Sequence, residues 1–397
     1  MKASKKSVAR RKKAEKSSQV TLVNPVSSHF PAFIIGNALV WQVRALVEIR
    51  EQMEPEAFEA LALEFGRYKA GMAFGSSPIV HDALEEFGAR YVVQPGSGQG
   101  RTLAICGAGP TLRQHAAEYC AQVDDVWGCN SAATWLHHAG HKVTHGFTVD
   151  QTEHMAREWE DAPDIEYLVA STVHPELMDV LVGAGRRFRY FHNFVGVNEK
   201  PVLLTDTDGQ QRSMNYEDWL YTALFPTTVR SGSGLNSVTR AIDIAQFMGY
   251  EKIYVLGADC ALQYEGAIPN AAPGDPAYIE WLKNKTVMHA DGGSALASDA
   301  TPITLRGEID GRTWLTKPDM AISAQWLARL VQKAGDRIEL VGDTLPNAIL
   351  NAKTVTRRVT DQKGKILRYE TVAVDPHDYT WMPNFQDSEG NLANLPV

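Results

Sequence analysis

Short apolar runs alternate with amphipathic segments from about residue 101 onward. Runs of roughly five β-prone residues bounded by glycine or polar turns are typical of strands, and apolar spacings of three and four are typical of helices. The predicted strands are 102–106, 125–129, 143–149, 166–170, 187–191, 252–256 and 337–341. The predicted helices are 111–122, 131–139, 152–159, 175–182, one ending near 248, and 319–333. This alternation predicts an α/β fold with a Rossmann-like, doubly wound, mostly parallel sheet.

The chain outside this alternation divides into further regions. Residues 1–19 form a basic tail that we expect to be disordered, and residues 20–100 form a mainly helical N-terminal region. A glycine-rich stretch at 94–101 predicts a hinge. We therefore place the Rossmann-like nucleotide-binding domain at 101–350 and a C-terminal extension at 351–397.

Composition and charge narrow the class of protein. The 397-residue chain has 44% hydrophobic and 22% charged residues, as expected for a globular protein with more than one folded unit. The tail carries eight Lys or Arg residues and one Glu, so the remainder is more acidic than the formal net charge of −8. A broad nucleic-acid-binding face is not expected. The tail could contact an anionic partner, although a solvated terminus explains it more simply.

The cysteines and apolar stretches point to a cytoplasmic protein. The four cysteines, Cys106, Cys120, Cys129 and Cys260, show no Cys-x-x-Cys pairing. Buried, reduced thiols explain them better than a zinc site. We expect no membrane span, because no stretch approaches the length that a spanning helix needs.

The turn after the first predicted strand, in CGAGPTL, carries the clearest chemical signal. Gly107 and Gly109 allow a sharp turn and the close approach of a ligand. Pro110 suits the first position of a helix, and Thr111 places a hydroxyl beside the N–H groups of its first turn. These features predict a phosphate site. Leu112 replaces the third glycine of the dinucleotide motif, so the turn also fits an ordinary strand-to-helix connection.

Polar residues also follow other predicted strands. We expect them at one edge of the sheet, because the carboxyl ends of parallel strands meet there. Asn130 and Ser131 can hydrogen-bond a base or a ribose, or cap the next helix. Asp150 and Asp259 can hold Mg²⁺ against nucleotide phosphates. The alternative roles are an N-cap for Asp150 and a turn aspartate for Asp259.

Histidines offer candidate acid–base groups. His289, in MHADGG, has the glycine-rich surroundings of a mobile loop and can act as a general base or steady a leaving phosphate. An exposed loop histidine is the alternative. Four further histidines lie close together in sequence but need not converge, so we assign them no metal. They are His137, His138, His141 and His145.

The motifs together resemble a known family. CGAGPTL, Asn130, the strand ending at Asp150, SGSGLNS and YVLGADC are similar in order and spacing to the domain of archaeal 6-hydroxymethylpterin diphosphokinases, the MptE-like family. That domain also occurs in motility accessory factor glycosyltransferases and is related in pattern to a bacterial sialyltransferase family. The resemblance covers about residues 103–350. It implies a Rossmann-like fold that binds a nucleotide in the glycine loop and transfers a group from it.

The resemblance also assigns roles to individual residues. Gly107, Gly109, Pro110 and Thr111 match the family's Gly-x-Gly-Pro-Ser turn, with threonine in place of serine. Asp150 matches the aspartate that ends the third strand. The later Ser/Gly turn and Gly-x-Asp motif are matched by Ser231, Ser233, Gly257 and Asp259.

Three functions follow as hypotheses. The first is a diphosphokinase-like transferase that moves a group from a nucleoside triphosphate such as ATP to a small acceptor, assisted by Mg²⁺. Its catalytic residues would be Asp150, Asp259 and His289. The alternative is a glycosyltransferase that uses a CMP-sugar, with His289 as acid or base and little need for metal. The second alternative is a non-catalytic structural or interaction protein that retains the fold.

Overall fold

The computed structural model describes the central sheet, the helices around it and several shorter segments. The described residues are 55–56, 92–161, 163–170, 173–191, 202–205, 211–214, 236–264, 276–277, 280, 286–288, 294–296, 304–360, 366–373, 385–387 and 390–391. The basic tail and most of the predicted N-terminal region lie outside these residues. Ser231, Ser233 and His289 also lie outside them.

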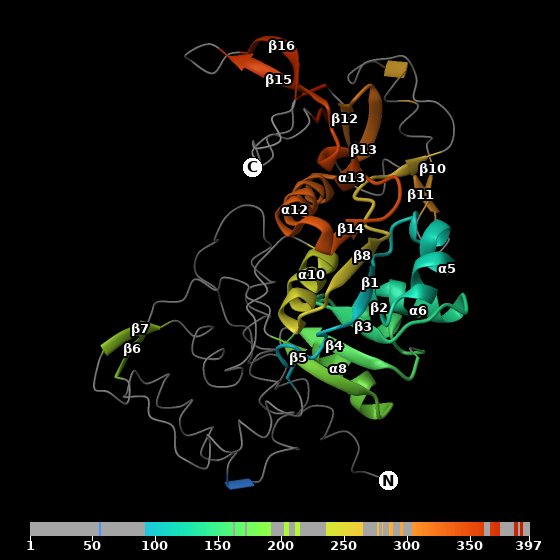
Figure 1. The fold of residues 1–397 in the computed structure, drawn as a ribbon, viewed down its shortest axis with the longest axis vertical. Helices are drawn as coiled ribbons and strands as arrows, with labels where there is room; N and C mark the ends of the chain where they lie inside the picture. Colours follow the sequence, from blue (N-terminus) through green and yellow to red (C-terminus); the bar gives the residue numbers. More distant parts are fainter. Residues whose placement is uncertain are drawn as a thin grey trace, which may run out of the picture.

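Seven parallel strands form the central sheet in the order β14-β8-β1-β2-β3-β4-β5 (Figure 1). They are β1 (Thr102–Cys106), β2 (Asp125–Cys129), β3 (His145–Thr148), β4 (Glu166–Ala170), β5 (Arg187–Phe191), β8 (Lys252–Leu256) and β14 (Ile338–Leu340). Only β3 and β14 differ from their predicted bounds, and both are shorter. The predicted Rossmann-like α/β fold is confirmed.

Helices cover both faces of this sheet (Figure 1). The main helices are α5 (Leu112–Gln122), α6 (Ser131–His138), α7 (His154–Glu158), α8 (Pro175–Gly183), α10 (Ser237–Met248), α12 (Pro318–Ala334) and α13 (Leu345–Leu350). One face packs Ala104 and Cys106 against α5 and α6, and the other packs Leu103 and Ile105 with α10 and α12. Burial on both faces explains why the strands are continuous apolar runs.

The remaining strands form small separate sheets. They are β6 (Val202–Thr205), β7 (Gln211–Met214), β9 (Gln263–Tyr264), β10 (Thr286–Met288), β11 (Ser294–Leu296), β12 (Leu305–Ile309), β13 (Arg312–Thr316), β15 (Thr354–Thr360) and β16 (Ile366–Ala373). The sequence did not predict the β12–β13 hairpin. Its turn residues Asp310 and Gly311 have φ of 47° and 77°, as a two-residue type I′ turn requires. Asp310 also accepts hydrogen bonds from the backbone of Lys353 and Thr354, which ties the turn to β15.

The predicted hinge and the residues just before it contact the end of α10 and strand β5. Val92 forms a parallel bridge with Tyr190 and is fully buried. The N–H of Gly98 donates to the carbonyl of Met248 at 2.7 Å, and an added Cβ at Gly98 would lie 2.6 Å from the ring of Tyr250. These contacts hold the segment against the end of α10.

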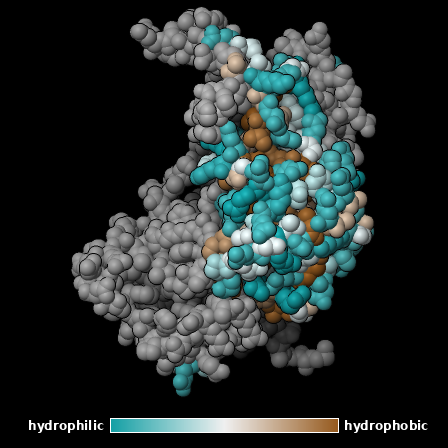
Figure 2. Space-filling view, viewed as in Figure 1, coloured by the Kyte–Doolittle hydropathy of each residue, from teal (hydrophilic) through white to brown (hydrophobic). Residues whose placement is uncertain are grey.

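All four cysteines are free and buried, as predicted. Among the residues that the structure describes, no helix is both long and apolar enough to cross a membrane. The described surface in Figure 2 is mostly hydrophilic, with hydrophobic residues gathered in a few patches.

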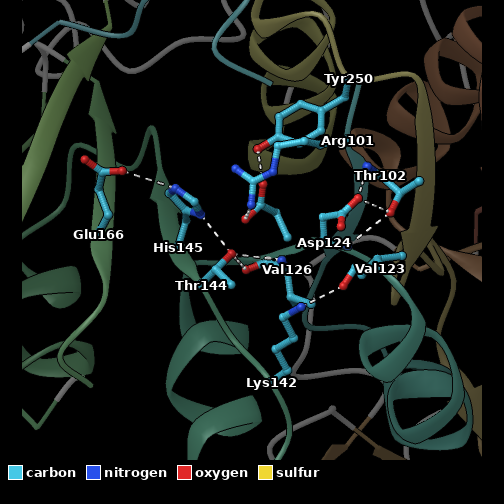
Figure 3. A network of polar contacts seen from close by, with 11 residues as sticks. Arg101, Thr102, Val123, Asp124, Val126, Lys142, Thr144, His145, Glu166 and Tyr250 are labelled. Carbon is cyan, nitrogen blue, oxygen red and sulfur yellow. Dashed lines mark hydrogen bonds and ion pairs between the residues drawn. The ribbon is translucent and has the colours of Figure 1, made fainter. Parts of the chain in front are cut away.

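A polar network stabilises the sheet at the amino-terminal side of its strands (Figure 3). Asp125 is 2% exposed and accepts hydrogen bonds from Arg101 at 2.8 Å and Tyr250 at 2.7 Å. His145 lies 2.8 Å from the hydroxyl of Thr144 and 3.2 Å from the carboxylate of Glu166. These partners give His145 a structural role, away from the ends of the strands where ligands bind.

The Glu166 carboxylate predicts a specific loss of stability in acid. Hydrogen bonds from His145 and Arg189 lower the pKa of Glu166 to about 2 despite its burial. The ionised Glu166 carboxylate therefore contributes fully to the free energy of unfolding above the ordinary glutamate pKa, and this contribution is lost as the pH falls towards 2. We expect Glu166→Gln to remove up to about 2 kcal/mol of stability at neutral pH and none near pH 2. Urea unfolding of both proteins from neutral pH down to pH 2 measures this, and a pH-independent difference would contradict it.

Candidate functional site

The order of strands reverses at β1. The chain runs from β1 outward to β5 and returns through α10 to β8, which lies on the other side of β1. In open α/β sheets, ligands bind beyond the carboxyl ends of the strands at such a switch point. The glycine loop after β1 and the turn from Gly257 to Asp259 after β8 both lie here.

These two loops pack backbone against backbone. The N–H of Gly109 donates to the carbonyl of Gly257 at 2.8 Å. An added Cβ on Gly109 would lie 2.1 Å from Asp259 Oδ2, and one on Gly257 would lie 2.2 Å from the carbonyl oxygen of Gly107. Gly257 also has φ of +61°. The glycines therefore allow a close approach, but it is the approach of one loop of the protein to the other.

The carboxylate of Asp259 occupies the N-terminus of α5. Thr111 donates to it through the backbone N–H at 3.3 Å and through the hydroxyl at 2.8 Å. These are the donors that the sequence assigned to a phosphate, so in this structure a side chain of the protein takes them. Pro110, which precedes them, has no N–H to offer.

The environment of Asp259 changes its acidity. The residue is 4% exposed. Burial raises the pKa of Asp259 to about 6, although the hydrogen bonds from Thr111 act in the opposite direction. A carboxyl group that titrates near neutral pH can exchange protons with a substrate, as general acids and bases do.

A cavity of about 330 Å³ lies beside Asp259. It is lined by Thr111, Gln114, Asp259, Ala261, Leu262, the hairpin residues from Arg312 to Leu315, and Asp343. The guanidinium of Arg312 pairs with the carboxylate of Asp343, and its central carbon lies 4.0 Å from the centre of the Trp314 ring. The volume is at the lower end of the range for small-molecule sites.

Asn130 is held in an unusual conformation at the end of β2. Its φ of 52° is uncommon for a residue other than glycine. The backbone N–H donates to Phe147 at 3.0 Å, and the carbonyl accepts from the indole of Trp159 at 3.1 Å. The side-chain Oδ1 accepts from the hydroxyls of Thr148 at 2.9 Å and Ser237 at 3.1 Å.

The side-chain N–H₂ of Asn130 has no acceptor among the described residues. The side chain makes no capping hydrogen bond to α6, which removes one of the two roles that the sequence left open. In the described part of the chain, nothing accepts a hydrogen bond from Nδ2. Ser131, the first residue of α6, is half-buried. Strained residues that the surrounding structure holds in place are common at binding sites.

The structure does not bring Asp150 and Asp259 together. They follow β3 and β8, which are three positions apart in the sheet and so roughly 14 Å apart. One oxygen of Asp150 accepts from the N–H of Thr152 at 2.8 Å, which is a turn interaction. Among the described residues, no three His, Cys, Asp or Glu side chains are grouped as a metal site would require. The shared Mg²⁺ site is therefore not assembled from these two carboxylates, and a role for magnesium stays a prediction.

Comparison with known proteins gives a weak structural match. No protein-family model matches the chain, and no curated protein matches it. It is similar to a solved structure of the MAf glycosyltransferase from Magnetospirillum magneticum AMB-1, with 12% sequence identity and a TM-score of 0.40. The similarity covers 69% of this chain and 44% of that protein, so the chain spans less than half its length. At this TM-score the likeness does not determine what the chain binds.

Sequence reasoning missed several residues of the site. Thr148 and Ser237 orient Asn130, and Arg312, Trp314 and Asp343 form much of the cavity wall. The last three come from the unpredicted hairpin and from the loop after β14. The Asp310-Gly311 pair between alternating apolar residues was the available signal for that hairpin.

Proposed function

We propose that the chain is a nucleotide-dependent group transferase of the glycosyltransferase type. The nucleotide binds beyond β1, β2 and β3, on the Asn130 side of the switch point. Asn130 is the observation that carries this proposal, because its strained backbone and two hydroxyl partners leave its amide N–H₂ as a fixed donor. A fixed donor at this edge suits the acceptor atoms of a base, a ribose or a phosphate.

The arrangement of the acidic residues favours a glycosyltransferase over a diphosphokinase. Phosphoryl transfer relies on cations that bridge the phosphates, and Asp150 and Asp259 lie too far apart to hold one ion between them. A single buried acid with a pKa of about 6 suits proton transfer to or from an acceptor hydroxyl instead. The diphosphokinase remains the second candidate, with the Gly107 and Gly109 loop as its nucleotide site.

Asn130→Asp tests the nucleotide site with little change of shape. The aspartate keeps an oxygen for Thr148 and Ser237 and tolerates positive φ, but it replaces the amide donor by a negative charge. A nucleotide at a hundred times its dissociation constant should stabilise the wild type by about 2.7 kcal/mol. We expect this stabilisation to disappear in the variant. Thermal unfolding with CMP, CDP, UDP and ATP, each with and without Mg²⁺, measures it.

The exposed Ala108 provides a second test that leaves the packed glycines intact. Ala108→Trp places a large side chain over the glycine loop, and Ala121→Trp places the same side chain on the exposed last turn of α5. Only Ala108→Trp should prevent stabilisation by a nucleotide. Stabilisation by ATP with Mg²⁺ alone would support the diphosphokinase, and stabilisation by CMP or CDP without metal would support the glycosyltransferase. If no nucleotide stabilises the wild type, the proposal fails and the non-catalytic hypothesis takes its place.

A further inference from the structure

The cavity beside Asp259 lies on the other side of the β1 loop from Asn130. Asn130 follows β2, whereas the cavity is formed by the start of α5, the turn after β8, the β12–β13 hairpin and the loop after β14. The switch point therefore has two separate sides, with a fixed amide donor on one and a buried carboxylate on the other. A transferase needs two such places, one for the donor and one for the acceptor.

The charges around the cavity argue against an anionic occupant. Asp343 is paired with Arg312. Within the described ranges, no lysine or arginine forms an ion pair with Asp259, which lies at the buried end of the cavity. A phosphate or a carboxylate there would face this carboxylate in a region that water reaches poorly, where repulsion between like charges is strong.

The hydrogen-bonding groups of the cavity match a hydroxyl. Asp259 Oδ2 accepts the hydroxyl of Thr111 at 2.8 Å, and the N–H of Thr111 is shared between Oδ1 and Oδ2 at 3.3 Å from each, so Oδ1 is the less engaged oxygen. Oδ1 therefore has capacity for a further donor. The exposed Gln114 amide can both donate and accept. A hydroxyl does both as well, whereas an ammonium only donates and offers no acceptor to the Gln114 amide.

We infer that this cavity binds the acceptor of the transfer, a neutral polyhydroxyl compound of the sugar class, and that Asp259 takes the proton of its reacting hydroxyl. The acceptor role rests on the proposed function, whereas the chemistry of the occupant rests on the cavity itself. In the transfer step, the acceptor oxygen bonds to the anomeric carbon of the nucleotide-linked sugar as its proton passes to Asp259. The bond from that carbon to the phosphate oxygen breaks, and the nucleotide leaves with the electron pair.

The occupant can be tested on the full chain without any nucleotide. Saturation-transfer NMR would use methyl β-glucopyranoside as the neutral probe, ethanolamine as the cationic probe and methyl phosphate as the anionic probe. We expect a signal for the glycoside alone. Binding by methyl phosphate or ethanolamine in place of the glycoside, or no signal for the glycoside, would overturn the inference.

Matched variants show whether the glycoside binds in the cavity. Gln114→Trp covers the cavity from α5, and Ala261→Phe fills it from the turn after β8. Two positions are used so that the test still works if one variant does not fold. Ala121→Trp, on the same helix as Gln114, is the control. The signal should fall at least fivefold in both cavity variants and persist in the control and in Asn130→Asp. An equal signal in all four variants would place the glycoside elsewhere and refute the site. If the wild type binds the glycoside but no nucleotide, the proposed function is overturned, whereas the class of occupant is not.

Discussion

Gly257→Ala is expected to destabilise the protein by about 3–5 kcal/mol. Two costs add. The φ of +61° is strained for alanine, and the new Cβ would lie 2.2 Å from the carbonyl oxygen of Gly107, which is backbone and cannot rotate away. The glycine loop would have to move from β8, and the hydrogen bond from Gly109 would be lost. Urea unfolding followed by circular dichroism measures the change.

Gly185→Ala separates these two costs. Gly185 has φ of +64°, but no atom lies within 4 Å of the position of its added Cβ. The strain alone should therefore cost about 1–2 kcal/mol. If Gly257→Ala loses no more stability than Gly185→Ala, the close packing of the two loops does not contribute as argued.

Asp259→Asn is expected to reduce the proposed transfer activity strongly while leaving the fold at least as stable at pH 8. The asparagine oxygen can accept the same hydrogen bonds from Thr111, and the cost of burying a charge disappears. Loss of a general base should reduce kcat by about 10²–10⁴-fold. The measurements are unfolding at pH 8 and transfer from a sugar linked to whichever nucleotide the binding panel identifies.

The pH dependence of stability gives a check that needs no substrate. Burial raises the pKa of Asp259 from 3.8 to about 6, so the folded protein binds a proton in this range that the unfolded chain does not. Wild-type stability should therefore rise as the pH falls through 6 towards 4, by at most about 3 kcal/mol, and this rise should be missing in Asp259→Asn. Identical pH profiles would show that Asp259 is not the titrating group, and retained kcat would refute its role as base.

The sheet was predictable because its strands are buried on both faces. Residues such as Ile105, Val126 and Val255 form local apolar runs, and the turns between them supply the boundaries. Asn130 and Asp259 were found for the same reason, since each directly follows such a run. A polar residue directly after an apolar run could therefore be assigned to the ligand-binding edge of the sheet from the sequence alone.

The partners of those residues were not predictable from local patterns. Thr111 and Asp259 are 148 positions apart in sequence, and no spacing rule connects them. The expected pairing of Asp150 with Asp259 assumed only a common edge, whereas the order of strands separates them. Asp259 therefore contacts the glycine loop of the adjacent strand β1, and the glycines receive a side chain where a phosphate was expected.

The position of Asp259 at the start of α5 also affects how strongly anions from the solution bind at this helix end. The partial positive charge at a helix N-terminus usually attracts sulfate or phosphate from a buffer. Above about pH 6, the carboxylate of Asp259 already neutralises this charge, without the loss of freedom that capturing an ion requires. Binding of added phosphate or sulfate at this helix end is therefore expected to be weak, because the Asp259 carboxylate already acts as the counter-ion.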